Sequence, residues 1–163
     1  MSVLVPDYVL DSIYAITPEL LKKHGIQAMY IDLDGTMASR HTPLPPETVV
    51  PFLQSILDAG IQVVVLSNNK KKRVELFCRD FPCPWLHRCL KPLGWGLARA
   101  KKLTGVPLKQ TALVGDQIFT DVFCGNARGA LTILVDSLDV GTGRYIEWRR
   151  KFEMKYINRG KRL

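Results

Sequence analysis

Short apolar runs alternate along the chain with stretches in which apolar residues recur at helical spacing. The apolar runs have the length of buried strands, and they cover residues 28–33, 61–66, 86–90, 111–114 and 131–135. The stretches between them have the pattern of helices, at residues 47–59, 70–79, 95–103 and 120–128. Strands that alternate with helices indicate a parallel sheet with right-handed crossovers. The pattern therefore predicts an α/β fold, a three-layer Rossmann-like core around a central parallel sheet.

The N-terminal stretch has a different pattern. Val9, Leu10, Ile13 and Ile16 recur at helical spacing, which predicts an amphipathic helix from Tyr8 to Ile16. Thr17-Pro18 ends that helix and begins a second turn that runs to Lys23. The apolar stripe is expected to dock on the domain, and contact with a membrane is the alternative.

The chain reads as one domain without a linker or an internal repeat. Its 163 residues are 47% hydrophobic, enough to bury a core without disulfides. We expect N-terminal amphipathic helices in residues 1–25, a core in 26–136 and a basic C-terminal segment in 137–163. No apolar run reaches the roughly 20 residues of a membrane span, and no secretory signal pattern is present, so a cytoplasmic location is expected.

The formal net charge of +8 favours anionic partners, without choosing among nucleic acid, acidic lipid and phosphorylated metabolites. Cys78, Cys83, His87 and Cys89 cluster in the sequence, so a zinc site is conceivable. Their spacing is loose and contains no Cys-x-x-Cys pair, which favours reduced, partly buried thiols.

Residues with carboxylate, hydroxyl, amide or ammonium groups follow almost every predicted strand. In a parallel sheet, the carboxyl ends of the strands meet at one edge, where ligands bind. The candidates at this edge are Asp32 and Asp34, Ser67 with Asn68 and Asn69, Lys91, and Asp116 with Asp121. Each has an ordinary explanation as a helix cap, a turn residue or a solvated side chain. Their common position after strands favours a shared site.

The pair Asp32 and Asp34 suggests specific chemistry. Two carboxylates two residues apart, at a strand end, point to the same side of the chain, and a divalent cation would offset their repulsion. One carboxylate could then attack phosphorus while the other handles the proton of the leaving group.

The order Asp-x-Asp-Gly-Thr, Ser, Lys and Gly-Asp-x-x-x-x-Asp resembles the motif order of the haloacid dehalogenase-like (HAD) superfamily. Segments 67–69, 91–94 and 115–122, with segments 6–18 and 125–135, look like the YqeG-type HAD IIIA phosphatases over nearly the whole chain. Two departures are visible. Asp34-Gly35-Thr36 stands where that subfamily has Asp-Asn-Thr, and Gly125-Asn126-Ala127-Arg128-Gly129 departs from its Gly-Asn-Arg-Ala-Gly.

This resemblance, taken with the chemistry above, implies a role for each residue. Asp32 would attack phosphorus and form an aspartyl phosphate, and Asp34 would act as general acid and base. Mg²⁺ would be held by Asp32, the backbone carbonyl of Asp34 and Asp116. Ser67, Asn68 and Lys91 would bind the phosphoryl oxygens, and Asp121 would support the metal site or orient Lys91.

The substrate is a separate prediction. The segments after Thr36 and between Ser67 and Lys91 leave no room for a cap domain, which suits a large or surface-bound substrate. Relatives implied by the resemblance include phosphatidylglycerophosphate phosphatases, so an anionic lipid headgroup is the expected partner. Residues 70–73 and a basic tail that begins at Arg149 would allow peripheral contact with the inner face of the membrane.

Other readings stay open at this point. A phosphatase of nucleic-acid ends or of soluble sugar phosphates has the same chemistry, although no aromatic platform for single strands is visible, which makes nucleic acid the weaker partner. A non-catalytic phospho-acceptor module is the second alternative, and the presence of Asp34 beside the nucleophile speaks against it. The sequence leaves the oligomeric state undetermined.

Overall fold

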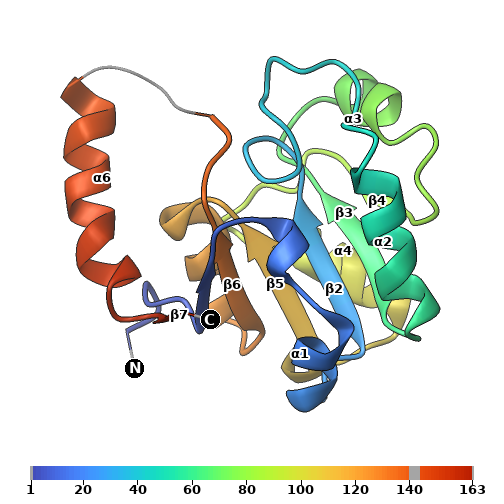
Figure 1. The fold of residues 1–163 in the computed structure, drawn as a ribbon, viewed down its shortest axis with the longest axis horizontal. Helices are drawn as coiled ribbons and strands as arrows, with labels where there is room; N and C mark the ends of the chain where they lie inside the picture. The colour runs from blue at the N-terminus through green and yellow to red at the C-terminus, as the bar shows by residue number, and fades with distance from the viewer. Residues whose placement is uncertain (1, 140–143, 163) are drawn as a thin grey trace.

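A seven-stranded sheet forms the centre of the computed structural model, which describes residues 2–139 and 144–162 (Figure 1). Neighbouring strands are parallel, in the order β4-β3-β2-β5-β6-β1-β7. The strands are β1 (Tyr8–Leu10), β2 (Ala28–Asp32), β3 (Gln62–Leu66), β4 (Trp85–Leu86), β5 (Thr111–Gly115), β6 (Leu131–Val135) and β7 (Lys161–Arg162). The predicted α/β class with a parallel sheet is confirmed.

The helices lie largely where the apolar spacing predicts them. They are α1 (Pro18–Lys23), α2 (Val49–Asp58), α3 (Lys71–Phe77), α4 (Trp95–Thr104), α5 (Phe123–Asn126) and α6 (Arg144–Ile157). Short turns of helix add η1 (Ile13–Ala15), η2 (Leu108–Gln110) and the π-helical turn η3 (Ile118–Val122). The predicted helix 120–128 is therefore two elements, a π-helical turn followed by a short α-helix.

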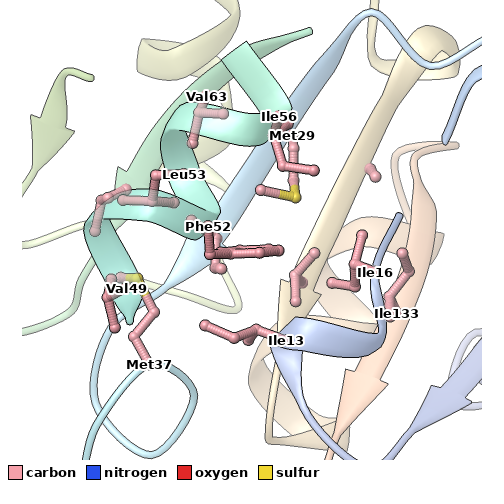
Figure 2. Packing of buried hydrophobic residues seen from close by; sticks show 14 of the residues in the cluster. Ile13, Ile16, Met29, Met37, Val49, Phe52, Leu53, Ile56, Val63 and Ile133 are labelled. Carbon is pink, nitrogen blue, oxygen red and sulfur yellow. The ribbon is translucent and has the colours of Figure 1, made fainter. Parts of the chain in front are cut away.

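The inner strand β2 is buried on both faces and divides the core in two. Met29 and Ile31 point into one cluster with Leu53 of α2, while Tyr30 on the other face packs with Leu97 of α4. Figure 2 shows the first cluster, in which side chains of α2 meet those of β2 and of the N-terminal segment. Helices on both faces explain why the strands are nearly continuous apolar runs rather than alternating ones.

The predicted helix from Tyr8 to Ile16 is wrong. Residues 8–10 instead form β1, which lies between β6 and β7, and η1 follows it. The spacing of apolar residues fits a helix, but the neighbouring strands offer backbone partners, and all three residues of β1 are buried. Ile13 and Ile16 are also buried, so this stripe belongs to the core and is not available to a membrane. The second predicted turn is confirmed as α1.

The predicted strand at 86–90 is shorter than expected. β4 ends at Leu86, and the backbone of Arg88 and Leu90 has positive φ, at 47° and 50°. Positive φ cannot continue a strand, so the chain turns at this point. Between β2 and α2, residues 33–48 contain no helix or strand.

Helix α6 packs against a small cluster made by η3 and Leu134 of β6. Phe152 stacks on Phe119, with ring centroids 5.9 Å apart, and Tyr156 packs against the small cluster around Ile118. Residues 140–143, which belong to the predicted basic C-terminal segment, lie outside the described residues. No helix in the described part of the chain is long and apolar enough to cross a membrane.

Candidate active site

The carboxyl edge of the sheet carries a polar pocket. Asp32 is the last residue of β2, Ser67 follows β3, and Asp116 follows β5. The pocket has a volume of about 330 Å³, and it is lined by Asp32, Asp34, Arg40, Ser67, Asn68, Asn69, Lys91, Gln117, Thr120 and Asp121. The sequence pattern therefore brings most of the predicted residues to one opening.

Lys91 lies at the floor of this pocket and is buried. Its Nζ donates to Asp32 Oδ1 and to Asp121 Oδ1, the latter at 2.7 Å. The side chain of Asn68 holds the backbone of Lys91 in place, since its Oδ1 accepts from the Lys91 N–H at 2.9 Å and its Nδ2 donates to the Lys91 carbonyl at 3.2 Å. One cation is thus fixed between two carboxylates.

Asp116 completes a group of three carboxylates. One oxygen each of Asp32, Asp116 and Asp121 lie within 4.8 Å of one another. The Thr36 hydroxyl is 3.2 Å from Asp32 Oδ2 and 3.3 Å from Asp116 Oδ1, and the Ser137 hydroxyl donates to Asp116 Oδ2 at 2.6 Å. Hydroxyl groups from two different loops therefore orient the carboxylates of Asp32 and Asp116.

The charges at the floor do not balance. Burial raises the pKa of Asp32, Lys91 lowers it, and the neighbouring charges of Asp121 and Asp116 raise it again. Burial also raises the pKa of Asp116. Burial lowers the pKa of Lys91, but Asp121 and Asp32 outweigh this and raise it above its ordinary value. Two buried carboxylates that share one lysine, with the partly buried Asp116 close by, leave an excess of negative charge that a further cation would relieve.

The donor set fits a divalent metal. Carboxylate oxygens are the ligands that Mg²⁺ prefers, and Lys91 engages only one oxygen of Asp32 and one of Asp121. Among the described residues, this is the one group of three or more His, Cys, Asp or Glu side chains placed to hold an ion.

Cys78, Cys83 and Cys89 are buried free thiols.

Two glycines make room for these carboxylates. A Cβ on Gly115 would lie 2.2 Å from Asp121 Cγ, and one on Gly35 would lie 2.4 Å from Asp116 Oδ2. Gly35 also has φ +89°, a conformation that other residues rarely adopt. The backbone of the Asp-x-Asp-Gly-Thr turn therefore approaches Asp116 as closely as a glycine allows.

The side chain of Asp34 lies outside the three-carboxylate group, on the wall of the pocket. Its Oδ1 pairs with Arg73 Nη2 at 3.1 Å, and its Oδ2 accepts from Asn69 Nδ2 at 3.2 Å. Arg73 is itself fixed, because Nη1 donates to the Pro43 carbonyl and the guanidinium lies over the Phe77 ring. Ser67 Oγ is buried and accepts from the Asn69 N–H at 3.0 Å.

Some residues of the site were missed by reasoning from the sequence. Ser137 comes just after β6, so the rule of inspecting the residues after each strand could have found it. Thr36 stands inside the acidic motif, where its hydroxyl was not considered. Arg73 was counted only within a basic run. Arg40 lines the pocket and is paired with Asp139 at 2.9 Å, and no sequence signal marked either residue.

Comparison with known proteins gives a consistent result. A model of the haloacid dehalogenase-like hydrolases matches residues 5–127. Over 97% of this chain, the sequence is 30% identical to the probable phosphatase YqeG of Bacillus subtilis and covers 92% of that protein. It is 27% identical to the chloroplastic phosphatidylglycerophosphate phosphatase 1 of Chlamydomonas reinhardtii, over 84% of this chain and 54% of that protein.

Solved structures share the fold at lower identity. The deoxy-D-mannose-octulosonate 8-phosphate phosphatase of Haemophilus influenzae, in its cobalt-bound form, has a TM-score of 0.53 at 20% identity, covering 83% of this chain and 91% of that one. The 3-deoxy-D-manno-octulosonate 8-phosphate phosphatase of Moraxella catarrhalis, in complex with magnesium, phosphate and KDO, also has a TM-score of 0.53, at 16% identity, covering 88% of this chain and 94% of that one.

Site and comparisons agree: carboxylates and a lysine meet at the carboxyl edge of a parallel sheet, and the family match covers the strands that deliver them. The chain belongs to the haloacid dehalogenase-like hydrolases and is a phosphatase of the HAD type.

Proposed function

We propose that this phosphatase is a magnesium-dependent phosphomonoester hydrolase that works through an aspartyl phosphate on Asp32 and acts on phosphatidylglycerophosphate. The observation that carries the chemistry is the position of Asp32, at the floor of the pocket and in contact with Lys91. A carboxylate held by one fixed cation in a water-restricted floor is a suitable nucleophile for phosphorus.

The first step forms a bond between an Asp32 oxygen and phosphorus while the ester P–O bond breaks. Lys91 and the Ser67 hydroxyl would hold the transferred phosphoryl oxygens, since Ser67 Oγ accepts from a backbone N–H and its own hydrogen remains for a ligand. Asn68 lines the same pocket, and its predicted contact with phosphate stays a prediction beside its hydrogen bonds to Lys91.

Asp34 is the proposed general acid and base. It would give a proton to the leaving alkoxide in the first step and take one from the attacking water in the second. Water then breaks the Asp32–phosphate bond and releases inorganic phosphate. Arg73 and Asn69 would orient the Asp34 side chain for both transfers.

Asp32 and Asp116 would hold Mg²⁺ together with the backbone carbonyl of Asp34, and the grouping of their carboxylates with that of Asp121 supports this. The ion would neutralise the negative charge that otherwise repels a phosphate from Asp32. Asp121 also contacts Lys91, so it would serve the metal and the lysine together.

The proposed substrate rests on the relatives and on the charge of the chain. Two relatives are named phosphatidylglycerophosphate phosphatases, from Chlamydomonas reinhardtii and Arabidopsis thaliana. The net charge of +8 favours an anionic surface, and peripheral contact with the membrane would follow from such a substrate.

Phosphate release with Mg²⁺ tests the proposal. The substrates would be short-chain phosphatidylglycerophosphate, a sugar phosphate and a 5′-phosphorylated oligonucleotide, with Asp32→Asn as the blank. We expect strong preference for the lipid and no turnover in the variant. Turnover of Asp32→Asn at the wild-type rate would overturn the mechanism, whereas preference for a soluble substrate would overturn the lipid assignment alone.

A further inference from the structure

Three large apolar side chains stand in solvent beside the active site. Leu90, Leu93 and Trp95 are 50%, 65% and 63% exposed, and they belong to one short loop, residues 90–95. A shallow hollow of about 400 Å³ lies against this loop, lined by Leu93, Gly94, Trp95, Ala98, Arg99 and Arg128. Exposed apolar groups clustered at a functional opening indicate a contact surface.

The loop is fixed by hydrogen bonds. The Leu93 N–H donates to the Leu90 carbonyl at 2.7 Å, and the Arg128 guanidinium donates to the Leu93 carbonyl at 2.6 Å and to the Cys124 carbonyl at 3.1 Å. Behind the loop, the Gly96 N–H donates to the Cys89 carbonyl. The exposed side chains therefore project from a backbone that is held in place, so little order has to be gained on binding.

The same loop supplies the buried lysine of the site. Lys91 points inward to Asp32, while Leu90 and Leu93 on either side of it are exposed. The exposed apolar side chains and the lysine that contacts the proposed nucleophile therefore belong to the same short segment. A surface bound by this loop would lie next to the opening of the pocket.

The charged residues near this loop indicate which kind of surface it would bind. Between Asp80 and Asp116 the sequence contains no acidic residue. In the structure, Arg99 and Arg128 line the hollow together with Leu93 and Trp95, and none of the described residues that line it is acidic. Apolar and aromatic side chains amid Lys and Arg match the interface of an anionic bilayer, where Trp and Leu enter the headgroup region and cations meet the phosphates.

We propose that residues 90–95 form a membrane-docking loop that seats Leu93 and Trp95 in an anionic bilayer and presents the pocket to the headgroups. This inference rests on the proposed function and deepens it, because it says how a lipid-borne phosphate would reach Asp32. It also moves the expected membrane contact from the N-terminal stripe, which is buried, to this loop.

Cosedimentation with vesicles tests the docking loop. Wild-type protein would be compared with the double variant Leu93→Ser/Trp95→Ser on phosphatidylcholine vesicles and on an equal mixture of phosphatidylcholine and phosphatidylglycerol. We expect the wild type to prefer the anionic vesicles and the double variant to lose about tenfold or more in partitioning. The matched control is Leu76→Ser/Leu103→Ser, two exposed leucines on α3 and at the end of α4, with binding close to wild type.

Two further readouts separate the possible outcomes. Turnover of the soluble ester p-nitrophenyl phosphate should be the same in the double variant and the wild type, which shows an intact site. Undiminished vesicle binding by the double variant would overturn the proposal. If the wild type is a dimer and the double variant is a monomer that still binds vesicles, the loop is a dimer interface and the proposal is also overturned. The wild type could also bind vesicles through the loop and yet release no phosphate from phosphatidylglycerophosphate. That result would support the docking loop and overturn the proposed substrate.

Discussion

At the scale of single residues, the site depends on positions where the backbone comes very close to a carboxylate. Gly35 is the sharpest case, because an added Cβ would meet the Asp116 carboxylate. Gly105 is a useful comparison, since it also has positive φ but has open space around its Cα. Substituting each glycine in turn therefore distinguishes the effect of backbone strain from the effect of displacing the Asp116 carboxylate.

We expect Gly35→Ala and Gly105→Ala to lose similar stability, about 1 kcal/mol each, from the strained φ. Only Gly35→Ala should lose activity, by about a hundredfold, because Asp116 must shift. Thermal unfolding and phosphate release on both variants measure the two effects. Equal activity in the two variants would show that Asp116 tolerates displacement.

The buried thiols allow a second prediction at this scale. Burial raises the pKa of Cys78 and Cys83 to about 12, and the neighbouring Cys83 charge adds to the shift at Cys78. Both thiols are therefore protonated in the folded protein at pH 8. Iodoacetamide should alkylate them only as fast as the protein unfolds, which mass spectrometry of the labelled chain would measure. Rapid labelling of the folded protein would contradict this.

The same shift has a consequence for stability. Because the folded pKa lies above the ordinary value of 9.0, the protonated thiols contribute their full stabilisation below pH 9. That contribution is lost as the pH rises from about 9 through 12. A decline in unfolding free energy over this range is the expected result, and it should be smaller in Cys78→Ala/Cys83→Ala, in which the raised pKa values of Cys89 and Cys124 remain.

The site residues at the ends of strands could be predicted from the sequence. The site residue on a helix, Arg73, could not, because the sequence does not show which side of the helix faces the site. Asp32, Ser67 and Asp116 come straight after apolar runs, so their common edge follows from the parallel sheet. Arg73 is one of four adjacent cations, and nothing in the sequence marks it out. In the structure Lys70, Lys71 and Lys72 are exposed, and only Arg73 turns toward Asp34.

At the scale of elements, helix α3 orients the side chain of Asp34 through Arg73. Its first turn places Arg73 between the Asp34 carboxylate, the Pro43 carbonyl and the Phe77 ring. The Arg73 and Asp34 side chains are only 16% and 18% exposed, so this pair is partly shielded from water. Shielding makes the pair more effective in orienting a side chain than a surface ion pair is.

We expect Arg73→Met to lower kcat about tenfold or more while leaving KM for a small phosphomonoester nearly unchanged, because the proposed proton donor loses its orientation. Partial recovery in Arg73→Lys would support a positioning role. Lys72→Met, the exposed neighbour, is the control and should retain wild-type kinetics. A rise in KM alone in Arg73→Met would instead indicate direct binding of substrate.

The longer buried strands were predictable because burial dictates their composition, and the very short strands were not. β3, β5 and β6 are apolar runs whose bounds nearly match the prediction. β1 and β4 contain three and two residues, and whether they pair depends on partners far away in the sequence. Apolar spacing alone could not distinguish β1 from a helix.

At the scale of the whole molecule, the residue that precedes β1 is bonded to a residue of β6 far away in the sequence. Asp7 Oδ2 accepts from the Thr132 N–H at 2.8 Å and from the Thr132 hydroxyl at 3.1 Å. The two residues are 125 positions apart in the sequence, and Thr132 is fully buried. This contact fixes where β1 enters the sheet beside β6.

Asp7→Ala should lower the free energy of unfolding by about 1–3 kcal/mol, because the buried Thr132 N–H loses its acceptor. Urea denaturation would measure the loss. Asp11→Ala, at an exposed aspartate close by in sequence, should change stability by less than about 0.5 kcal/mol. Equal losses in the two variants would show that the Asp7 contact contributes little.

The place of β1 between β6 and β7 has a consequence for synthesis on the ribosome. β1 precedes the other described strands in sequence, yet its neighbours in the sheet are β6 and β7, and β7 begins only at Lys161. β2, β3 and β5 can pair as they emerge, whereas the N-terminal segment must wait with its apolar residues uncovered. The part of the sheet formed by β6, β1 and β7 can therefore close only after Lys161 and Arg162 have been made.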